Sequence, residues 1–131
     1  MIVDTSALVA ILRGEPEAPA IARAIETHSR RLISAVSYVE AAVVIDAAHD
    51  PVASRRFDDL VREARLSIEA VTEAQARIAR DAYRDFGKGS GHKANLNFGD
   101  CFAYALAREK AELLLFKGEC FRHTDIQPAL E

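Results

Sequence analysis

Four acidic residues, Asp4, Glu40, Asp100 and Glu119, share one setting in the sequence. Each follows a short apolar segment or falls in the first turn of the helix expected after it. In a parallel sheet all strand-to-helix turns lie at one edge, so these side chains can converge although they are far apart in the chain. Carboxylates that meet at close range cannot all stay ionised unless cations offset their charges. Oxygen ligands of this kind suit Mg²⁺ or Mn²⁺, whose usual task is to activate water for an in-line displacement at phosphorus.

Each carboxylate also has a purely structural interpretation. Glu40 can be the reciprocal partner of Ser37 in a capping box, and Asp100 can be a favourable charge at a helix N-terminus. Glu119 lies in a polar loop, where an acidic residue is unremarkable. Asp4 is different, because a carboxylate at the end of a buried strand costs free energy unless something pairs with it. Position alone therefore singles out Asp4.

Strands and helices alternate along the chain, which predicts the elements that hold these residues. Strands are expected at 2–3, 31–36, 67–71 and 112–116, with a short edge strand at 124–127. Helices are expected from a cap at Thr5 or Ser6 to Gly14, from Pro16 onward, and at 37–48, 51–64, 73–86 and 98–110. Capping boxes are expected at Ser37 with Glu40 and at Thr72 with Gln75, and Asn97 can cap the last helix. The pattern predicts an α/β fold in which a mainly parallel sheet lies between two helical layers.

Length and composition describe one ordinary globular domain. The chain has 131 residues, of which 50% are hydrophobic and 28% are charged, so 1–131 is expected to fold as a single domain. The net charge of −3 argues against binding nucleic acid by bulk attraction. An N-terminus without a basic region and the lack of a long apolar run favour a cytoplasmic protein with no membrane association.

Any contact with nucleic acid must therefore use local basic groups. Two loops expected beside the acidic edge carry such groups, namely Lys88, His92, Lys93, Lys117, Arg122 and His123. An ordinary solvated loop explains the same residues equally well. The two cysteines cannot make a disulfide framework, and the histidines lack the spacing of a zinc site.

Four segments together resemble the PIN-domain ribonucleases, and more narrowly the VapC-type toxins of type II toxin–antitoxin pairs. They are Met-Ile-Val-Asp-Thr-Ser-Ala-Leu-Val-Ala at 1–10, Ser-Tyr-Val-Glu-Ala at 37–41, Leu-Asn-Phe-Gly-Asp-Cys-Phe-Ala-Tyr-Ala-Leu-Ala at 96–107 and Leu-Leu-Phe-Lys-Gly-Glu at 114–119. Each segment alone is a weak signal, but they span nearly the whole chain in the expected order.

The resemblance implies a roughly five-stranded parallel sheet and RNA cleavage that depends on Mg²⁺, with Mn²⁺ as a substitute. Asp4 and Asp100 would be the principal metal ligands, Glu40 would hold metal or water from the side, and Ser6 would orient Asp4 or a bound water. The last motif departs from the family pattern, because Cys120 stands where many relatives have an aspartate. That departure leaves Glu119 as the expected fourth catalytic and metal-binding carboxylate.

Other residues near these motifs have secondary roles. Asp125 is the reserve for the fourth carboxylate. A lone thiol beside carboxylates is more often a tolerated small residue than a ligand, which is how we interpret Cys120. Cys101 points about 100° away from Asp100 on a helix and is expected in the core.

The resemblance also implies partners. They are an RNA of the tRNA or rRNA class, a VapB-like antitoxin seated on the first two helices, and a second copy of the chain in a homodimer, or a heterotetramer or hetero-octamer with antitoxin. The alternative to an active toxin is a PIN-like module with weak or no catalysis that binds RNA or protein, which the Cys120 departure keeps open. An aspartic protease is rejected because the glycine of its motif is absent, and an aspartyl phosphatase because Ser6 occupies the place of its second aspartate.

Overall fold

Four short parallel strands form the central sheet in the computed structural model, which describes residues 1–131. They are β1 (Ile2–Val3), β2 (Leu32–Ser34), β3 (Ser67–Glu69) and β4 (Leu114–Leu115), in the spatial order β3-β2-β1-β4. Every neighbouring pair is parallel. Because β1 lies between β2 and β4, the chain segments that leave these three strands meet at one edge of the sheet.

A single bridge continues the sheet beyond β4. Leu114 pairs with Pro128, where the Leu114 amide donates to the Gln127 carbonyl at 3.0 Å and the Ala129 amide donates to the Leu114 carbonyl at 2.8 Å. The edge strand predicted at 124–127 is therefore reduced to this bridge, and the expected fold of roughly five strands is confirmed with four.

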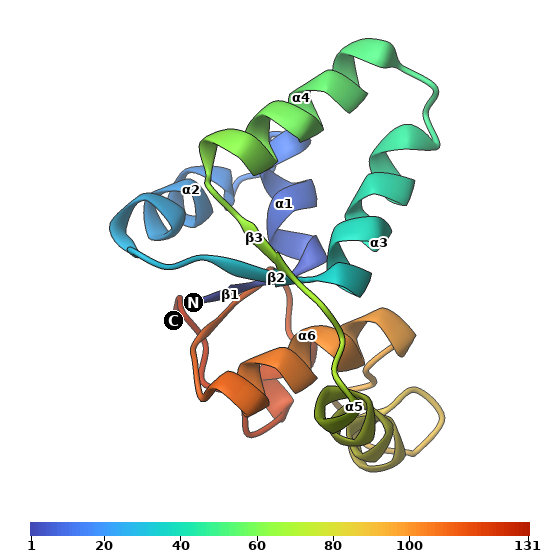
Figure 1. Cartoon of the computed structure of the whole chain (residues 1–131). Helices are drawn as coiled ribbons and strands as arrows, with labels where there is room; N and C mark the ends of the chain where they lie inside the picture. The colour runs from blue at the N-terminus through green and yellow to red at the C-terminus, as the bar shows by residue number, and fades with distance from the viewer.

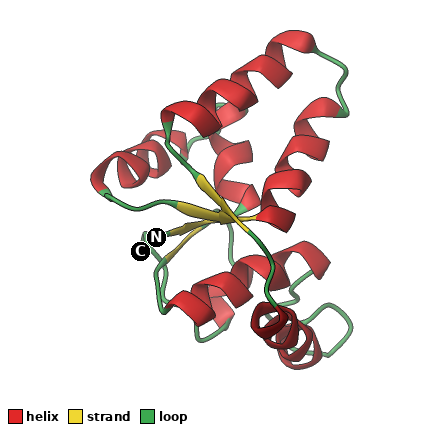
Figure 2. Ribbon diagram, viewed as in Figure 1, coloured by secondary structure: helices red, strands yellow, loops and turns green.

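Six α-helices cover the sheet. Their bounds are α1 (Thr5–Leu12), α2 (Ala18–Thr27), α3 (Ala35–Asp46), α4 (Pro51–Glu63), α5 (Glu73–Phe86) and α6 (Phe98–Lys110), followed by the 3₁₀ helix η1 (Cys120–His123). Helices α1 to α4 lie on one face of the sheet and α5 and α6 on the other (Figure 1). The strands are enclosed between these two helical layers (Figure 2), which confirms the predicted α/β/α architecture.

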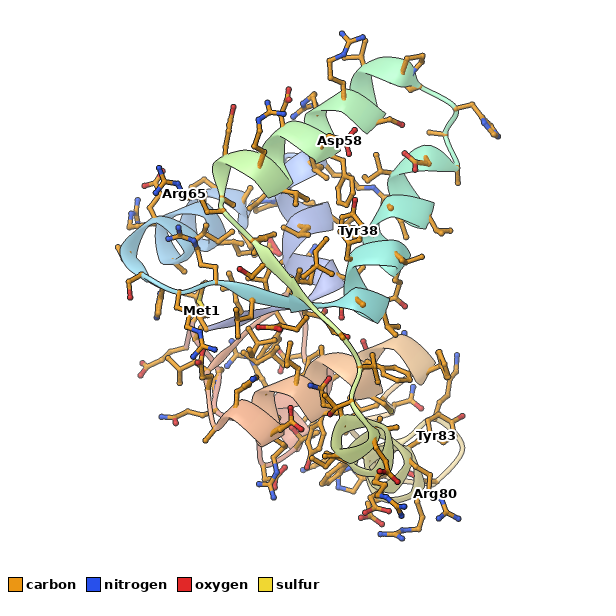
Figure 3. All side chains as sticks on the ribbon, in the orientation of Figure 1. Met1, Tyr38, Asp58, Arg65, Arg80 and Tyr83 are labelled. Carbon is orange, nitrogen blue, oxygen red and sulfur yellow. The ribbon has the colours of Figure 1, made fainter.

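Alternation along the strands divides the core into two halves, because successive side chains of a strand point to opposite faces. Ile2, Leu32 and Leu114 pack toward α5 and α6. Val3, Ile33 and Leu115 pack toward α1 to α4. On that second side Tyr38 of α3 lies between α3 and α4 (Figure 3). Its ring stacks on Phe57 of α4, with ring centroids 5.6 Å apart. None of the helices combines the length and apolar character needed to cross a membrane.

The start of α3 differs from the sequence prediction. Ser34 is its N-cap and accepts a hydrogen bond from the Val36 amide at 3.3 Å, so β2 ends at Ser34 and Ser37 lies buried inside the first turn. The predicted capping box of Ser37 with Glu40 is wrong, because the hydroxyl of Ser34 lies where the chain leaves the strand. Glu40 is therefore free of a capping role.

The other caps show how local hydroxyls and carboxylates compete for helix N-termini. Asp4 caps α1 in place of the predicted Thr5 or Ser6. Thr72 caps α5 and accepts a hydrogen bond from the Gln75 backbone amide. The side-chain amide of Gln75 donates to Glu109, so the expected capping box is not closed. Several elements are shorter than predicted: α2 begins at Ala18, β2 spans Leu32–Ser34, β3 ends at Glu69 and β4 spans Leu114–Leu115.

Candidate metal centre

Asp4 lies at the carboxyl end of β1 with only 2% of its surface exposed. Its Oδ2 accepts hydrogen bonds from the Ser6 amide at 3.0 Å and the Ser6 hydroxyl at 2.7 Å. Its Oδ1 is buried and has no hydrogen-bond partner. Burial, and to a lesser degree the charges of Asp100 and Glu40, raise the pKa of Asp4 to about 7 despite the bonds from Ser6. One oxygen of Asp4 thus fixes the local structure, and the other lacks a partner.

Ser6 connects the two strand ends that border the site. Its hydroxyl donates to Asp4 and accepts a hydrogen bond at 2.9 Å from the amide of Lys117, just after β4. The expected orientation of Asp4 by Ser6 has a direct structural basis in this pair of bonds. The exit of β4 also helps to hold the carboxylate of Asp4 through the same hydroxyl.

Asp100 sits in the first turn of α6, where it forms a reciprocal capping box with Asn97. The Asn97 side chain accepts from the Asp100 amide at 2.8 Å, and the Asp100 Oδ2 accepts from the Asn97 amide at 3.0 Å. Partial burial raises the pKa of Asp100, with the charge of Glu40 adding to the effect. The sequence predicted Asn97 as the cap, but not the second hydrogen bond, which the Asn97 amide donates to the Asp100 carboxylate.

Glu40 reaches the site from the second turn of α3. The Thr5 hydroxyl lies 2.7 Å from Oε1 of Glu40 and 2.9 Å from the Ser37 carbonyl, so it can donate to either acceptor. The charge of Glu40 acts on both Asp4 and Asp100. Three of the four predicted acidic residues therefore converge at the edge of the sheet. Sequence reasoning took Thr5 only as a possible helix cap and missed this contact.

The fourth predicted residue, Glu119, lies apart from these three. Its side chain is 77% exposed, and its nearest cationic group is the Arg122 guanidinium at 3.9 Å. With Glu17, Lys117 and Arg122 it borders a pocket of about 440 Å³ beside α2. Burial and the charges of Asp100, Asp4 and Glu119 raise the pKa of the neighbouring Cys120 thiol.

The side chain of the reserve candidate, Asp125, bonds to residues of α6 that lie away from Asp100. It accepts a hydrogen bond from the Tyr104 hydroxyl at 2.8 Å and pairs with the Arg108 guanidinium at 2.9 Å. These partners lie one and two turns beyond Asp100 along the helix. Asp125 therefore joins the chain after η1 to the middle and end of α6. Cys101 is buried on the same helix, as expected.

The basic loop residues divide into two groups. Lys117 pairs with Glu15 and Glu17, and Arg122 lies 5.5 Å from the ring centroid of Phe116. Lys88 and Lys93 form no ion pair and lie in the loop after α5, which is closed by bonds between the backbone of Lys88 and Leu96 and of Leu96 and Phe86. Of these residues, Lys88 and Lys93 are therefore the lysines outside any ion pair, and both lie in the loop 87–97 that leads into α6.

The residues present fit a divalent cation bound by oxygen. The unpartnered Oδ1 of Asp4 and the repulsion among three carboxylates are both relieved by a cation. No three His, Cys, Asp or Glu side chains lie in a group that could hold a metal ion. Mg²⁺ does not require one, since it keeps several water ligands and is commonly bound through one or two carboxylates.

Known proteins match the chain over nearly its whole length. The family model of the PIN domain matches residues 1–127. Over 131 residues the chain is 56% identical to a VapC ribonuclease of Mycobacterium bovis (Mb0625) and to ribonuclease VapC28 of Mycobacterium tuberculosis, covering all of this chain and 98% of each relative.

Two solved structures share the fold at low sequence identity. The M. tuberculosis VapC20, described as a sarcin-ricin loop cleaving toxin, has a TM-score of 0.73 at 16% identity and 95% coverage of both chains. A toxin–antitoxin complex from Klebsiella pneumoniae has a TM-score of 0.65 at 18% identity, covering 90% of this chain and 86% of that one. With the full-length relatives, these matches identify the chain as a member of the PIN-domain family and, within it, of the VapC ribonucleases.

Proposed function

We propose that this VapC ribonuclease is the endoribonuclease toxin of a toxin–antitoxin pair and depends on Mg²⁺, or Mn²⁺ as a substitute. The observation that carries the proposal is the buried Oδ1 of Asp4, which has no partner beside two further carboxylates. An unpaired buried carboxylate oxygen is costly in a protein that has no ligand for it. A cation removes that cost.

Asp4 and Asp100 would be the principal ligands, with Glu40 holding the metal or a water from the side. The metal supplies a water activated for attack on phosphorus and a positive charge that offsets the developing negative charge. Ser6 fixes Asp4 so that Oδ1 is the oxygen left for the ligand. Asn97 holds Asp100 at the start of α6, and Thr5 holds Glu40. Hydrolysis by in-line attack would leave a 5′-phosphate and a 3′-hydroxyl.

Glu119 remains in this proposal as an outer carboxylate. Its loop carries Cys120, whose thiol is close enough to Asp4 and Asp100 to respond to their charges. A bridging water would link Glu119 to the cation as an outer group. With Cys120 in the usual aspartate position, we expect the metal to bind more weakly than a fourth direct carboxylate would allow.

We propose a structured RNA of the tRNA or rRNA class as substrate. The similarity to a sarcin-ricin loop cleaving toxin supports this class. Lys88 and Lys93 are the best candidates for phosphate contacts, because neither is held in an internal ion pair, whereas Lys117 is paired with Glu15 and Glu17. The acidic net charge makes such local contacts necessary.

We propose two protein interfaces in the cytoplasm, where such a toxin acts. A VapB-like antitoxin would occupy the pocket of about 440 Å³ that Ile11, Ile25 and Leu60 line between α1, α2 and α4. A second copy of the chain would cover the outer face of α3, where Val39 and Val43 are 56% and 61% exposed. With antitoxin bound, such a dimer would form a heterotetramer or hetero-octamer.

The test of the function is cleavage of total RNA by purified protein, with Mn²⁺ and with chelator, beside the Asp4→Asn and Asp100→Asn variants. We expect cleavage only by the unaltered protein with metal. Equal cleavage by the variants, or cleavage that survives chelator, would exclude this mechanism. Expression should also arrest growth, and co-expression of the neighbouring gene's product should relieve the arrest.

The second candidate function is a PIN-like module that binds RNA or protein with little or no catalysis. Cys120 in the position of the last acidic residue is the specific observation in its favour. The same assays separate the two functions, because such a module would bind RNA without producing new 5′-phosphate ends in either metal.

A further inference from the structure

We infer that Gly99 is a positioning residue for Glu40: the missing side chain at position 99 is what allows the Glu40 carboxylate to lie against the first turn of α6. The inference rests on the proposed metal-dependent function. It adds a residue from outside the carboxylate set to the construction of the site.

The carboxylate of Glu40 occupies the space that a side chain at position 99 would need. A Cβ built on Gly99 would lie 2.5 Å from Cδ and 2.6 Å from Oε1 of Glu40, and closer still to Oε2. Real Cβ atoms essentially never come within 3.0 Å of a non-bonded heavy atom. Glu40 and an alanine at position 99 therefore cannot both keep their present positions.

This contact joins α3 to the residue directly before Asp100. Gly99 is the second residue of α6, between the Asn97 cap and Asp100. The Glu40 carboxylate thus lies beside the amino end of α6, where the helix dipole favours negative charge. In this position the charge of Glu40 contributes to the raised pKa of Asp100.

Thr5 holds the same carboxylate from another side. The Thr5 hydroxyl lies 2.7 Å from Oε1 of Glu40 and comes from the first turn of α1, which Asp4 caps. Glu40 is therefore confined between a hydroxyl on α1 and the bare Cα of Gly99 on α6. Moving it away from Gly99 would also disturb the bond to Thr5.

The backbone at position 99 does not itself demand glycine. Gly99 is not among the residues with positive φ, so alanine is compatible with its helical conformation. The group that would clash is the far end of a flexible side chain, which yields more readily than backbone. Gly99→Ala should therefore displace Glu40 and leave α6 in place.

The experiment is a double-mutant cycle of Gly99→Ala and Glu40→Ala, read as Mn²⁺ affinity of the RNA-free protein from the EPR signal of free Mn²⁺. We expect Gly99→Ala to weaken binding about tenfold in the otherwise unaltered protein, the scale seen when groups that orient metal ligands are lost. In the Glu40→Ala background the same substitution should change affinity less than about twofold, because its target is gone. Equal weakening in both backgrounds, or none in either, would overturn the inference.

The same cycle is also read by thermal unfolding in chelator, which keeps the inference separate from the proposed function. Gly99→Ala should lower the unfolding midpoint by a few degrees when Glu40 is present. It should not lower the midpoint in Glu40→Ala, where alanine adds helix propensity. A fall of the same size in both backgrounds would overturn the inference even if the protein bound no Mn²⁺ and the proposed function failed.

Discussion

The hydroxyl of Ser6 donates to Oδ2 of Asp4 at 2.7 Å, while Oδ1 of the same buried carboxylate has no partner. The same hydroxyl accepts a hydrogen bond from the Lys117 amide at 2.9 Å, which ties this arrangement to the end of β4. The two oxygens of this carboxylate therefore have different roles. One oxygen holds the turn between β1 and α1, and the other is left for a ligand.

Ser6→Ala should weaken both the metal site and the fold. We expect a loss of about 10- to 100-fold in Mn²⁺ affinity, because a group that orients a ligand is removed. Stability should fall by about 1 kcal/mol, because the hydroxyl's hydrogen bonds with Asp4 and with the Lys117 amide are both lost. Isothermal titration with Mn²⁺ and urea unfolding measure the two effects.

Ser54→Ala is the matched control for Ser6→Ala. Ser54 donates to Asp46 at 2.6 Å on the exposed surface of the α3–α4 pair, far from the acidic edge. This variant should keep normal Mn²⁺ affinity. If both serine variants bound the metal as the unaltered protein does, Ser6 would have no part in the site.

Much of the fold and part of the site could be predicted from the sequence, because both depend on local patterns. The apolar segment before Asp4 predicts a strand, and Asn97 predicts the start of the helix that carries Asp100. In a parallel sheet such strand ends and helix starts meet at one edge. The cap of α3 could not be chosen in the same way. Ser34 and Ser37 are both good N-caps, and only the point where β2 leaves the sheet decides between them.

Long-range contacts were beyond sequence reasoning for a different reason. The contact of Glu40 with Gly99 and the bond from Thr5 to Glu40 join residues 59 and 35 positions apart, which no local pattern encodes. From the sequence, Glu119 was the expected fourth carboxylate and Asp125 the reserve. Their surroundings separate them, since Asp125 is bonded to Tyr104 and Glu119 is exposed.

The metal-free protein should lose stability as pH rises from about 4 to about 7. Asp4 binds its proton more tightly in the folded protein, where its pKa is raised from 3.8 to about 7, chiefly by burial. The unfolded chain therefore releases this proton first, and each further unit of pH up to about 7 favours unfolding. A shift of this size corresponds to about 4 kcal/mol as an order of magnitude. Asp100, whose pKa is also raised, acts in the same direction.

Urea unfolding between pH 4 and pH 8, in chelator and in saturating Mg²⁺, measures this dependence. Mg²⁺ should remove most of it, because a cation stabilises the ionised carboxylates. Asp4→Asn should flatten the curve in chelator, with Asp125→Asn as a control that keeps it. A metal-free protein whose stability does not change over this range would contradict the raised pKa of Asp4.

Cys120→Asp should strengthen metal binding. Burial and the charges of Asp100 and Asp4 raise the pKa of the Cys120 thiol, and we expect a carboxylate at this position to add an oxygen ligand to the same group. We expect about a tenfold gain in Mn²⁺ affinity, equivalent to about 1.4 kcal/mol. Cys120→Ser has nearly the same size without the charge and should leave the affinity unchanged. If serine gave the same gain as aspartate, the thiol itself would be the obstacle and not the missing charge.

A pair of amide substitutions decides which acid serves as the fourth carboxylate. Glu119→Gln should lower Mn²⁺ affinity a few fold, by up to about 1 kcal/mol for an outer group, and leave stability unchanged because the side chain is 77% exposed. Asp125→Asn should do the opposite: it weakens the contacts to Tyr104 and Arg108 and costs about 1 kcal/mol of stability, with normal metal affinity. Both variants remove one negative charge, so a general electrostatic effect would lower affinity equally in the two. Loss of Mn²⁺ binding in Asp125→Asn alone would mean that the segment after η1 rearranges when metal binds and supplies Asp125 as the ligand.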